Sequence, residues 1–333
     1  MRSMTVPVLA DDHAMSVPSR GAVATGRSYP GGVAAAGVQN AGVEEESSTS
    51  GFRRVRLVVA YDGSAFHGFA KNRDVSTVAG TLEDAMSLVC RTPVELVGAG
   101  RTDAGVHAWG QVISADLPAT TDLVGLARRL NKMCGPAIAV RSAEWAPWDA
   151  FNARFDAQWR HYRYTILNSP APNPFLARTT WHVHEPLDLG LMQLACDPFI
   201  GEHDFTSFCR RPKVGAAESG EADSGVLPDG PPAPREPSMV RHVLAAGWTD
   251  LGDGLLRLDI RATSFCHQMV RSITGTLVEV GLGKRTAGEI LGILRARDRG
   301  RAGQVAPPEG LCLWEVGYPS EPGTRPFPGG SGD

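Results

Sequence analysis

The chain has 333 residues, of which 42% are hydrophobic, and its formal net charge is −3. This length supports one large domain or two of moderate size, and the hydrophobic content supports a substantial core. No apolar run approaches the roughly 18 residues that a membrane-spanning helix needs, and no apolar block follows the N-terminus as in a secretory signal. We therefore expect a soluble, cytoplasmic protein without a membrane segment.

The acidic side chains are unevenly distributed along the chain. Three segments contain more acidic than basic residues, are rich in small or turn-forming residues and lack sustained hydrophobic periodicity: 1–51, 214–238 and 319–333. We interpret them as a disordered extension, a disordered insertion and a tail. Without these three segments the remaining body carries a net charge of about +4. Such a body holds phosphate groups only if its positive charge is concentrated on one face.

The six cysteines are scattered along the chain, and no Cys-x-x-Cys pair occurs. Several lie within apolar runs, where cysteine behaves as a small core residue. They are Cys90, Cys134, Cys196, Cys209, Cys266 and Cys312. We therefore predict six reduced thiols in a reducing compartment.

Hydrophobic periodicity predicts the same order of elements twice. In the first half we expect strands at 54–61, 94–100, 110–117 and 137–146, with helices at 77–91 and 122–134. In the second half we expect strands at 159–168, 240–250, 255–263 and 311–317, with helices at 188–200 and 265–281 and an additional helix at 286–296. Thr77 is the predicted N-cap of the first helix.

This duplicated order predicts an α+β fold with two tandem βαββαβ halves of the ferredoxin-like, split βαβ type. The N-terminal half spans residues 52–157, and the C-terminal half spans residues 158–318. We expect their antiparallel sheets to flank a central cleft. Two independent domains are the alternative, but the short join at residues 151–157 favours a shared site.

The most informative stretch is GAGRTDAGVHAWGQV, from Gly98 to Val112. Strand-like runs lie on both sides of it, so Arg101 and Asp103 are placed on a loop between two strands. Small residues around these two side chains permit tight backbone conformations and the close approach of a substrate. An ordinary hairpin turn, in which the Asp caps its own backbone, is the competing interpretation.

This stretch resembles the signature loop of the tRNA pseudouridine synthase A family, and similar motifs continue in the same order over residues 53–318. The further motifs are Tyr61-Asp62-Gly63 with Phe66 and Gly68, Thr77 to Leu82, Arg154-Phe155-Asp156-Ala157, Arg160-His161-Tyr162-Arg163-Tyr164, Gly201-Glu202-His203-Asp204-Phe205, Phe265 with Met269-Val270-Arg271, and Glu309-Gly310-Leu311 with Leu313. The chain departs from the family at Phe69-Ala70, where Trp-Gln is common, and in its Pro-rich insertion.

The resemblance implies a role for five residues. Asp103 is the implied catalytic nucleophile, and whether it attacks the sugar or removes a ribose proton is left open. Arg101 helps to open the stem-loop, with a plain surface arginine as the alternative. Tyr162 stacks on the uracil and is a candidate base for its C5 proton, and Leu311 contributes to substrate binding. Arg271 is the third member of the implied catalytic set.

Two of these assignments also have support from the residues themselves. Arg271 falls in an apolar helical setting, where an unpaired guanidinium is costly, so it needs a carboxylate partner. The family pattern names Asp103, and Glu279 is the alternative. Tyr162 and Tyr164 alternate along one strand and share a face, so only one of them needs to reach the cleft. The role of a core tyrosine fits Tyr164 better.

A metal centre is not indicated. His182 and His184 alternate along the chain, so extended backbone puts both on one face, but no third ligand with a recognisable spacing accompanies them. We interpret them as a solvated or structural pair and expect neither a metal nor a cofactor.

The implied function is an isomerase that converts uridines at positions 38 to 40 of the tRNA anticodon stem-loop to pseudouridine, acting as a homodimer. One alternative is a pseudouridine synthase that acts on another RNA. A second is a non-catalytic RNA-binding protein, because βαββαβ sheets are also the scaffold of the RRM. The aromatic RNP1 string of that module is missing, and Asp103 is unnecessary for binding alone.

Overall fold

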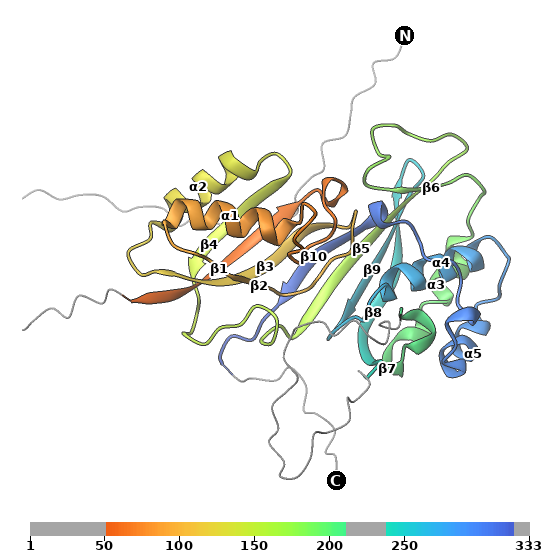
Figure 1. Cartoon of the computed structure of the whole chain (residues 1–333). Helices are drawn as coiled ribbons and strands as arrows, with labels where there is room; N and C mark the ends of the chain where they lie inside the picture. Colours follow the sequence, from red (N-terminus) through yellow and green to blue (C-terminus); the bar gives the residue numbers. More distant parts are fainter. Residues whose placement is uncertain (1–50, 211–237, 323–333) are drawn as a thin grey trace, which may run out of the picture. The chain divides into compact units, whose positions relative to one another are not determined.

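The structure is a computed structural model, and it describes residues 51–210 and 238–322 (Figure 1). Most of the predicted extension, insertion and tail therefore lies outside the described residues. Within the described parts of the chain, no helix is both long and apolar enough to cross a membrane.

The N-terminal half follows the predicted order closely. It contains β1 (Phe52–Tyr61), α1 (Val78–Cys90), β2 (Leu96–Gly98), β3 (His107–Pro118), α2 (Leu123–Cys134) and β4 (Ile138–Trp145). Thr77 caps α1 as predicted, because its side chain accepts a hydrogen bond from the Gly80 backbone N–H. Asp122 caps α2 in the same way through the Val124 N–H.

The C-terminal half contains the predicted elements and two further short strands. Its elements are β5 (Trp159–Asn168), β6 (Trp181–Val183), α3 (Leu189–Leu194), β7 (Gly201–Asp204), β8 (Val240–Gly252), β9 (Leu255–Ala262), α4 (Met269–Gly281), α5 (Glu289–Ala296) and β10 (Leu311–Gly317). Short 3-10 turns lie between them, including η3 (Thr206–Phe208).

The strands form one continuous ten-stranded sheet, in the order β4-β1-β3-β10-β5-β9-β8-β7, with β2 paired to β3 and β6 to β5. The expectation of two separate sheets is wrong in this respect. The last strand, β10, joins the halves because it pairs parallel to β3 and antiparallel to β5. Figure 1 shows α1 and α2 over the β1 and β4 end, with α3, α4 and α5 beside the β7 to β9 end.

Two predicted helices are too long. The helix predicted at 188–200 ends at Leu194, and a 3-10 turn with Pro198 at its second position follows it. Proline has no N–H and disfavours the α conformation in the preceding residue. The helix predicted at 265–281 begins only at Met269, because Gln268 adopts the left-handed conformation with φ of 62°. The residues before Met269 are therefore available as a loop.

The hydrophobic core runs continuously beneath both halves of the sheet. It includes fully buried Leu57 and Ile113 from the N-terminal half and Ile260 and Leu277 from the C-terminal half. Since this single core spans the junction, the two halves are held in a fixed geometry where β3, β10 and β5 meet.

Candidate active site

Asp103 lies on the connection between β2 and β3, as predicted, in what we call the Asp103 loop (residues 99–106). Gly105 has a φ of 79°, which glycine adopts without strain. A Cβ at Gly98 would lie 2.3 Å from the Phe69 ring, so only glycine fits there. The small residues of this stretch are thus required by the backbone and by close packing.

Neutral hydrogen bonds hold the Asp103 loop to the sheet beneath it. The fully buried Gln111 side chain donates to the Gly100 carbonyl at 2.7 Å and accepts from the Gly100 N–H at 3.3 Å. The hydroxyls of Tyr61 and Thr102 lie 2.8 Å apart. These contacts fix the backbone on both sides of Asp103 and leave its carboxylate without a role in capping the turn.

Each oxygen of the Asp103 carboxylate is contacted by a different side chain from the C-terminal half. Its Oδ1 lies 3.1 Å from His267 Nε2, and its Oδ2 lies 3.3 Å from Arg271 Nη1. Burial of the carboxyl favours the neutral acid, but the His267 hydrogen bond and the charges of His267 and Arg271 outweigh it and lower the pKa of Asp103. The carboxylate is therefore ionised, and its side chain is still 26% exposed.

Arg271 has the carboxylate partner that the family pattern names, Asp103. Arg271 lies on α4, its Nε donates to the Ala306 carbonyl at 2.7 Å, and its Nη1 reaches Asp103. The alternative partner, Glu279, is instead paired with Arg285. Two contacts on different nitrogens fix the guanidinium, whose side chain is only 14% exposed.

His267 is a site residue that the sequence does not reveal, because it falls in the segment predicted as the start of a helix. In the structure this segment is a loop, and the His267 carbonyl accepts a hydrogen bond from the Arg210 N–H at 3.0 Å. The signal available in the sequence is His267 itself, four residues before Arg271. Because α4 begins between them, at Met269, His267 lies on the preceding loop and Arg271 in the first turn of the helix, and both reach Asp103.

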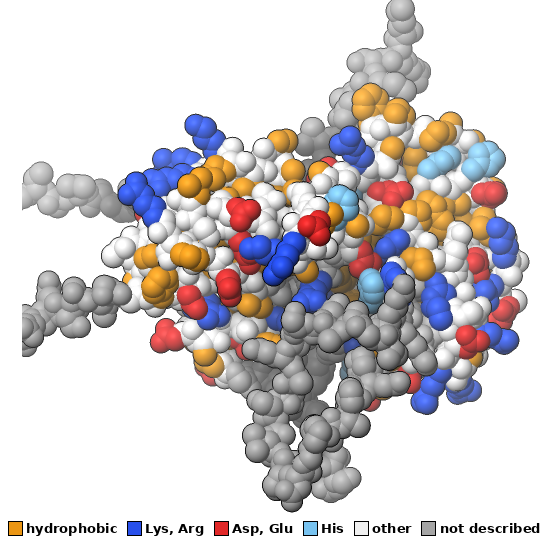
Figure 2. Space-filling model, viewed as in Figure 1, with side chains coloured by type: hydrophobic (Ala, Val, Ile, Leu, Met, Phe, Trp, Pro, Cys, Tyr) orange, Lys and Arg blue, Asp and Glu red, His pale blue; other side chains and the backbone are white. Residues whose placement is uncertain are grey.

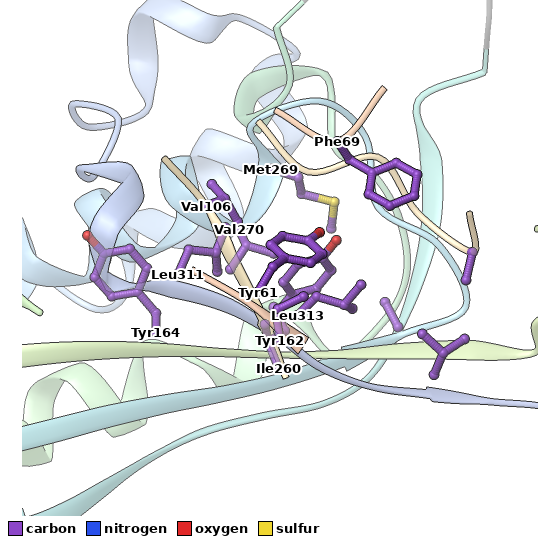
Figure 3. Close-up of a cluster of buried hydrophobic side chains, with 14 of the residues drawn as sticks. Tyr61, Phe69, Val106, Tyr162, Tyr164, Ile260, Met269, Val270, Leu311 and Leu313 are labelled. Atoms are coloured by element: carbon purple, nitrogen blue, oxygen red, sulfur yellow. The ribbon is translucent and has the colours of Figure 1, made fainter. Parts of the chain in front are cut away.

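Aromatic and apolar side chains line the same region (Figure 3). Tyr61 and Tyr162 lie close to Met269 and Leu313, whereas Tyr164 lies apart with its hydroxyl directed away. Tyr164 is fully buried and donates to the Pro307 carbonyl at 2.7 Å, which confirms it as the core tyrosine.

Of Tyr162 and Tyr164, it is Tyr162 that lies near the Asp103 loop. Its hydroxyl would lie 3.8 Å from a Cβ placed at Gly100, and its ring packs edge-on against Phe265. Burial raises the pKa of Tyr162 well above its usual range, although Arg160 opposes this effect. The phenol is therefore protonated at neutral pH.

The other predicted site residues have different surroundings. Leu311 is buried at the start of β10, opposite Tyr164, and belongs to the apolar cluster drawn with Tyr162. Arg101 is exposed on the Asp103 loop. Nearby, Arg160 donates to the Ala99 carbonyl at 2.9 Å and to the Thr263 carbonyl at 2.9 Å. Arg160 therefore ties the Asp103 loop to the segment that leads to His267.

The prediction of six free thiols is wrong for one pair. Cys209 and Cys266 form a disulfide, with their Cα atoms 5.8 Å apart. They are 57 residues apart in sequence, so spacing alone does not reveal the pair. The disulfide joins the end of η3 to the residue before His267.

His182, one of the two histidines considered as a metal ligand, hydrogen-bonds the Ser169 carbonyl through Nε2.

The site thus combines an ionised, partly exposed carboxylate with a protonated tyrosine and apolar walls. A carboxylate held in this way is suited to act as a nucleophile, or as a charge partner, at an electrophilic carbon. The aromatic and apolar side chains suit a planar base that has left its stack. Both features come together only where the two halves of the chain meet.

Comparison with known proteins identifies relatives over most of the chain. Residues 57–156 and 218–319 match the family described as tRNA pseudouridine synthase. The chain is 39% identical over 290 residues to tRNA pseudouridine synthase A of Gluconobacter oxydans, covering 85% of this chain and 96% of that protein. It is 40% identical to the protein of the same name from Brevibacillus brevis, covering 80% of this chain and all of that protein.

Proposed function

The chain belongs to the tRNA pseudouridine synthase family, and we propose that it isomerises uridines at positions 38 to 40 of the tRNA anticodon stem-loop. The main structural support for this proposal is the Asp103 carboxylate. It is held by His267 and Arg271, on the loop that Tyr162 approaches. The isomerisation breaks the glycosidic bond between N1 and the sugar, turns the uracil and joins its C5 to the sugar; C5 loses its proton and N1 gains one, so that the atoms balance.

Asp103 is the proposed nucleophile at the ribose anomeric carbon. Its lowered pKa keeps it ionised, and the contacts of Arg271 and His267 to separate oxygens fix the direction of the carboxylate. Negative charge leaves Asp103 when it forms a bond to the sugar and returns when that bond breaks. The fixed positive charge of Arg271 stabilises the ionised form before and after these steps.

Tyr162 and Leu311 are the proposed contacts for the uracil. Stacking on an aromatic ring holds a base that has been taken out of its helix. A role for Tyr162 as a base toward the C5 proton requires the phenolate, and the raised pKa of Tyr162 disfavours that form. We therefore assign Tyr162 as a platform and hydrogen-bond donor. The exposed Arg101 is the proposed group that fills the space left by the base.

An RNA-binding protein without catalysis would not need an ionised, paired carboxylate beside its aromatic platform. A synthase that acts on another RNA would share every feature of the site, so only the identity of the modified RNA distinguishes it from a tRNA synthase.

We further propose that the enzyme is cytoplasmic and that its two halves are diverged split βαβ units. A homodimer is proposed because the body charge of about +4 is small for holding a tRNA through one subunit.

Pseudouridine mapping on bulk tRNA from a strain that lacks this protein tests the function. We expect pseudouridine to disappear at positions 38 to 40 and to return when the purified protein is added. Retention of those pseudouridines, together with a loss in another RNA, would contradict the tRNA assignment. Light scattering at working concentration tests the dimer, and a fully active monomer would refute it.

A further inference from the structure

A cavity rich in arginine lies beside the Asp103 site. This cavity of about 690 Å³ is lined by Arg210, Arg297 and Arg299, together with Asp298, Thr206 and Gln268 among others. Arg210 follows η3, and the other two arginines follow α5, so the chain brings them together only by folding. Figure 2 shows basic side chains around α5, with acidic ones between them.

Two carboxylates, Asp298 and Asp204, lie near this arginine cavity and offset only part of the charge of its three arginines. Asp298 accepts hydrogen bonds from the Gly300 N–H and thereby shapes its own turn. Asp204 pairs with Arg297 Nε at 3.0 Å, and it also accepts from the Thr206 N–H. Within residues 51–210 and 238–322, no carboxylate is paired with Arg210. The lining therefore keeps an excess of positive charge.

Two of the arginines are anchored and still have donors to spare. Arg299 donates through Nη1 to the Gly303 carbonyl at 3.0 Å, and Arg297 is fixed through Nε. Each guanidinium has five N–H donors, and these contacts use only a few of them. Arginines that gather in a cavity repel one another, and an anion with several acceptor oxygens removes that cost.

The cavity is connected to the Asp103 site through one short segment. Gln268 lines the cavity, and its neighbour His267 contacts Asp103. The Arg210 N–H donates to the His267 carbonyl at 3.0 Å. An anion in the cavity is therefore bound next to the segment that holds the reacting carboxylate.

We propose that this cavity binds a backbone phosphate of the substrate RNA, flanking the uridine that enters the Asp103 site. The inference rests on the proposed function, because it requires an RNA strand to pass over Asp103. Arginine guanidinium groups match phosphate oxygens in a bidentate geometry. A phosphate held here fixes the strand on one side of the flipped nucleotide and so positions the sugar for Asp103.

The test compares tRNA binding and turnover of the wild type with those of Arg210→Gln, Arg297→Gln and the double variant. Arg91→Gln is the matched control, since Arg91 and Arg297 are both exposed arginines that end a helix in the left-handed conformation, with φ of 55° and 50°. Arg91 follows α1, and Arg297 follows α5, near opposite ends of the sheet (Figure 1). Circular dichroism confirms that each variant is folded.

We expect the double variant to bind tRNA about tenfold more weakly. The slope of log Kd against log salt concentration should become shallower by roughly 1 to 2, because phosphate contacts are lost. The loss should appear mainly as a higher KM for tRNA, and any fall in kcat should be smaller than that rise. Arg210→Lys should keep the salt slope and lose part of the affinity, because it retains the charge without the planar fork.

Unchanged affinity and slope in the double variant would overturn the proposal, and so would equal changes in Arg91→Gln. A fall in kcat without a change in KM would also overturn it, because the arginines would then act through His267 instead of holding a phosphate. Failure of the proposed function itself looks different, since the wild type would then form no pseudouridine in tRNA.

Discussion

Two carboxylates of this molecule are each held by a histidine and by arginine, in very different surroundings. Asp259 lies on β9, and its partners are His161 and Arg163 on the neighbouring β5 and Arg257 on its own strand. Asp103 lies on a loop, and its partner Arg271 is 168 residues away in sequence. One cluster fastens two strands together, whereas the other joins the two halves of the chain.

The comparison shows that a lowered carboxyl pKa does not by itself mark an active site. Burial raises the pKa of Asp259, but hydrogen bonds from His161 and the two arginines outweigh it, and the result is about 2. Cross-strand charge pairs of this kind support sheet pairing. Asp103 differs because it lies on a loop of small residues and because the Tyr162 hydroxyl lies next to Gly100 of that loop. These surroundings, and not the charge partners, are the reason why we propose Asp103 as the reacting group.

The largest expected effect is on turnover, and it should occur when Asp103 is replaced but not when Asp259 is replaced. Asp103→Asn should lower pseudouridine formation at least about a thousandfold, because it removes the nucleophilic charge and keeps the size. Asp259→Asn should leave turnover within about twofold. Single-turnover assays with purified variants and tRNA measure both. Comparable losses in the two variants would abolish the distinction.

The next largest effect concerns Arg271, which connects the C-terminal half to Asp103 in the N-terminal half. Arg271→Lys keeps a positive charge but loses the fork that contacts both Ala306 and Asp103, so kcat should fall about a hundredfold. The matched change is Arg163→Lys at Asp259, for which we expect almost no change in kcat. Near-normal turnover by Arg271→Lys would show that its charge alone is sufficient.

His267 should have a smaller effect, because its side chain is 49% exposed. His267→Ala should lower kcat about tenfold with little change in KM, since it releases one oxygen of Asp103. His267→Gln carries an amide donor and should recover part of that loss. If the alanine and glutamine variants are equally impaired, the hydrogen bond to Asp103 is not the reason for the effect.

The smallest effect is a pH dependence of stability at Asp259. The pKa of Asp259 is lowered to about 2 in the folded protein, so its contribution is present above the unfolded value of about 4 and is lost as the pH falls through 2. With allowance for solvent screening, this contribution is on the order of 1 kcal/mol. Urea unfolding of the wild type and Asp259→Asn between those pH values measures it. A difference that grows as the pH falls would contradict the sign.

The Asp103 loop is predictable because its signals are local. Gly98, at the end of β2, meets a steric requirement, Gly105 in the loop meets a backbone requirement, and β-branched runs mark the strands on both sides. The order of the main helices and strands follows equally from local periodicity. The identity of the Arg271 partner came from the family resemblance, since periodicity alone left Glu279 open.

The remaining features depend on contacts between distant parts of the chain. Phe265 and Cys266 continue the apolar pattern of α4, but the backbone there is held by the disulfide to Cys209 and by the Arg210 hydrogen bond. This is why His267 escaped prediction. β6 and β7 contain only three and four residues, too few to show a period. The continuity of the sheet rests on β10, whose partners are set by folding.

The most direct test of the account is the pKa of Asp103 in the intact enzyme, measured by NMR of the protein labelled with ¹³C at the aspartate carboxyl. The Asp103 signal is assigned by its absence in Asp103→Asn, and Asp259 serves as the reference carboxyl in the same spectrum. The account predicts that Asp103 titrates below the ordinary aspartate value and that His267→Ala moves its pKa upward. A wild-type Asp103 that titrates at or above the ordinary value would contradict the claim that the C-terminal half keeps this carboxylate ionised.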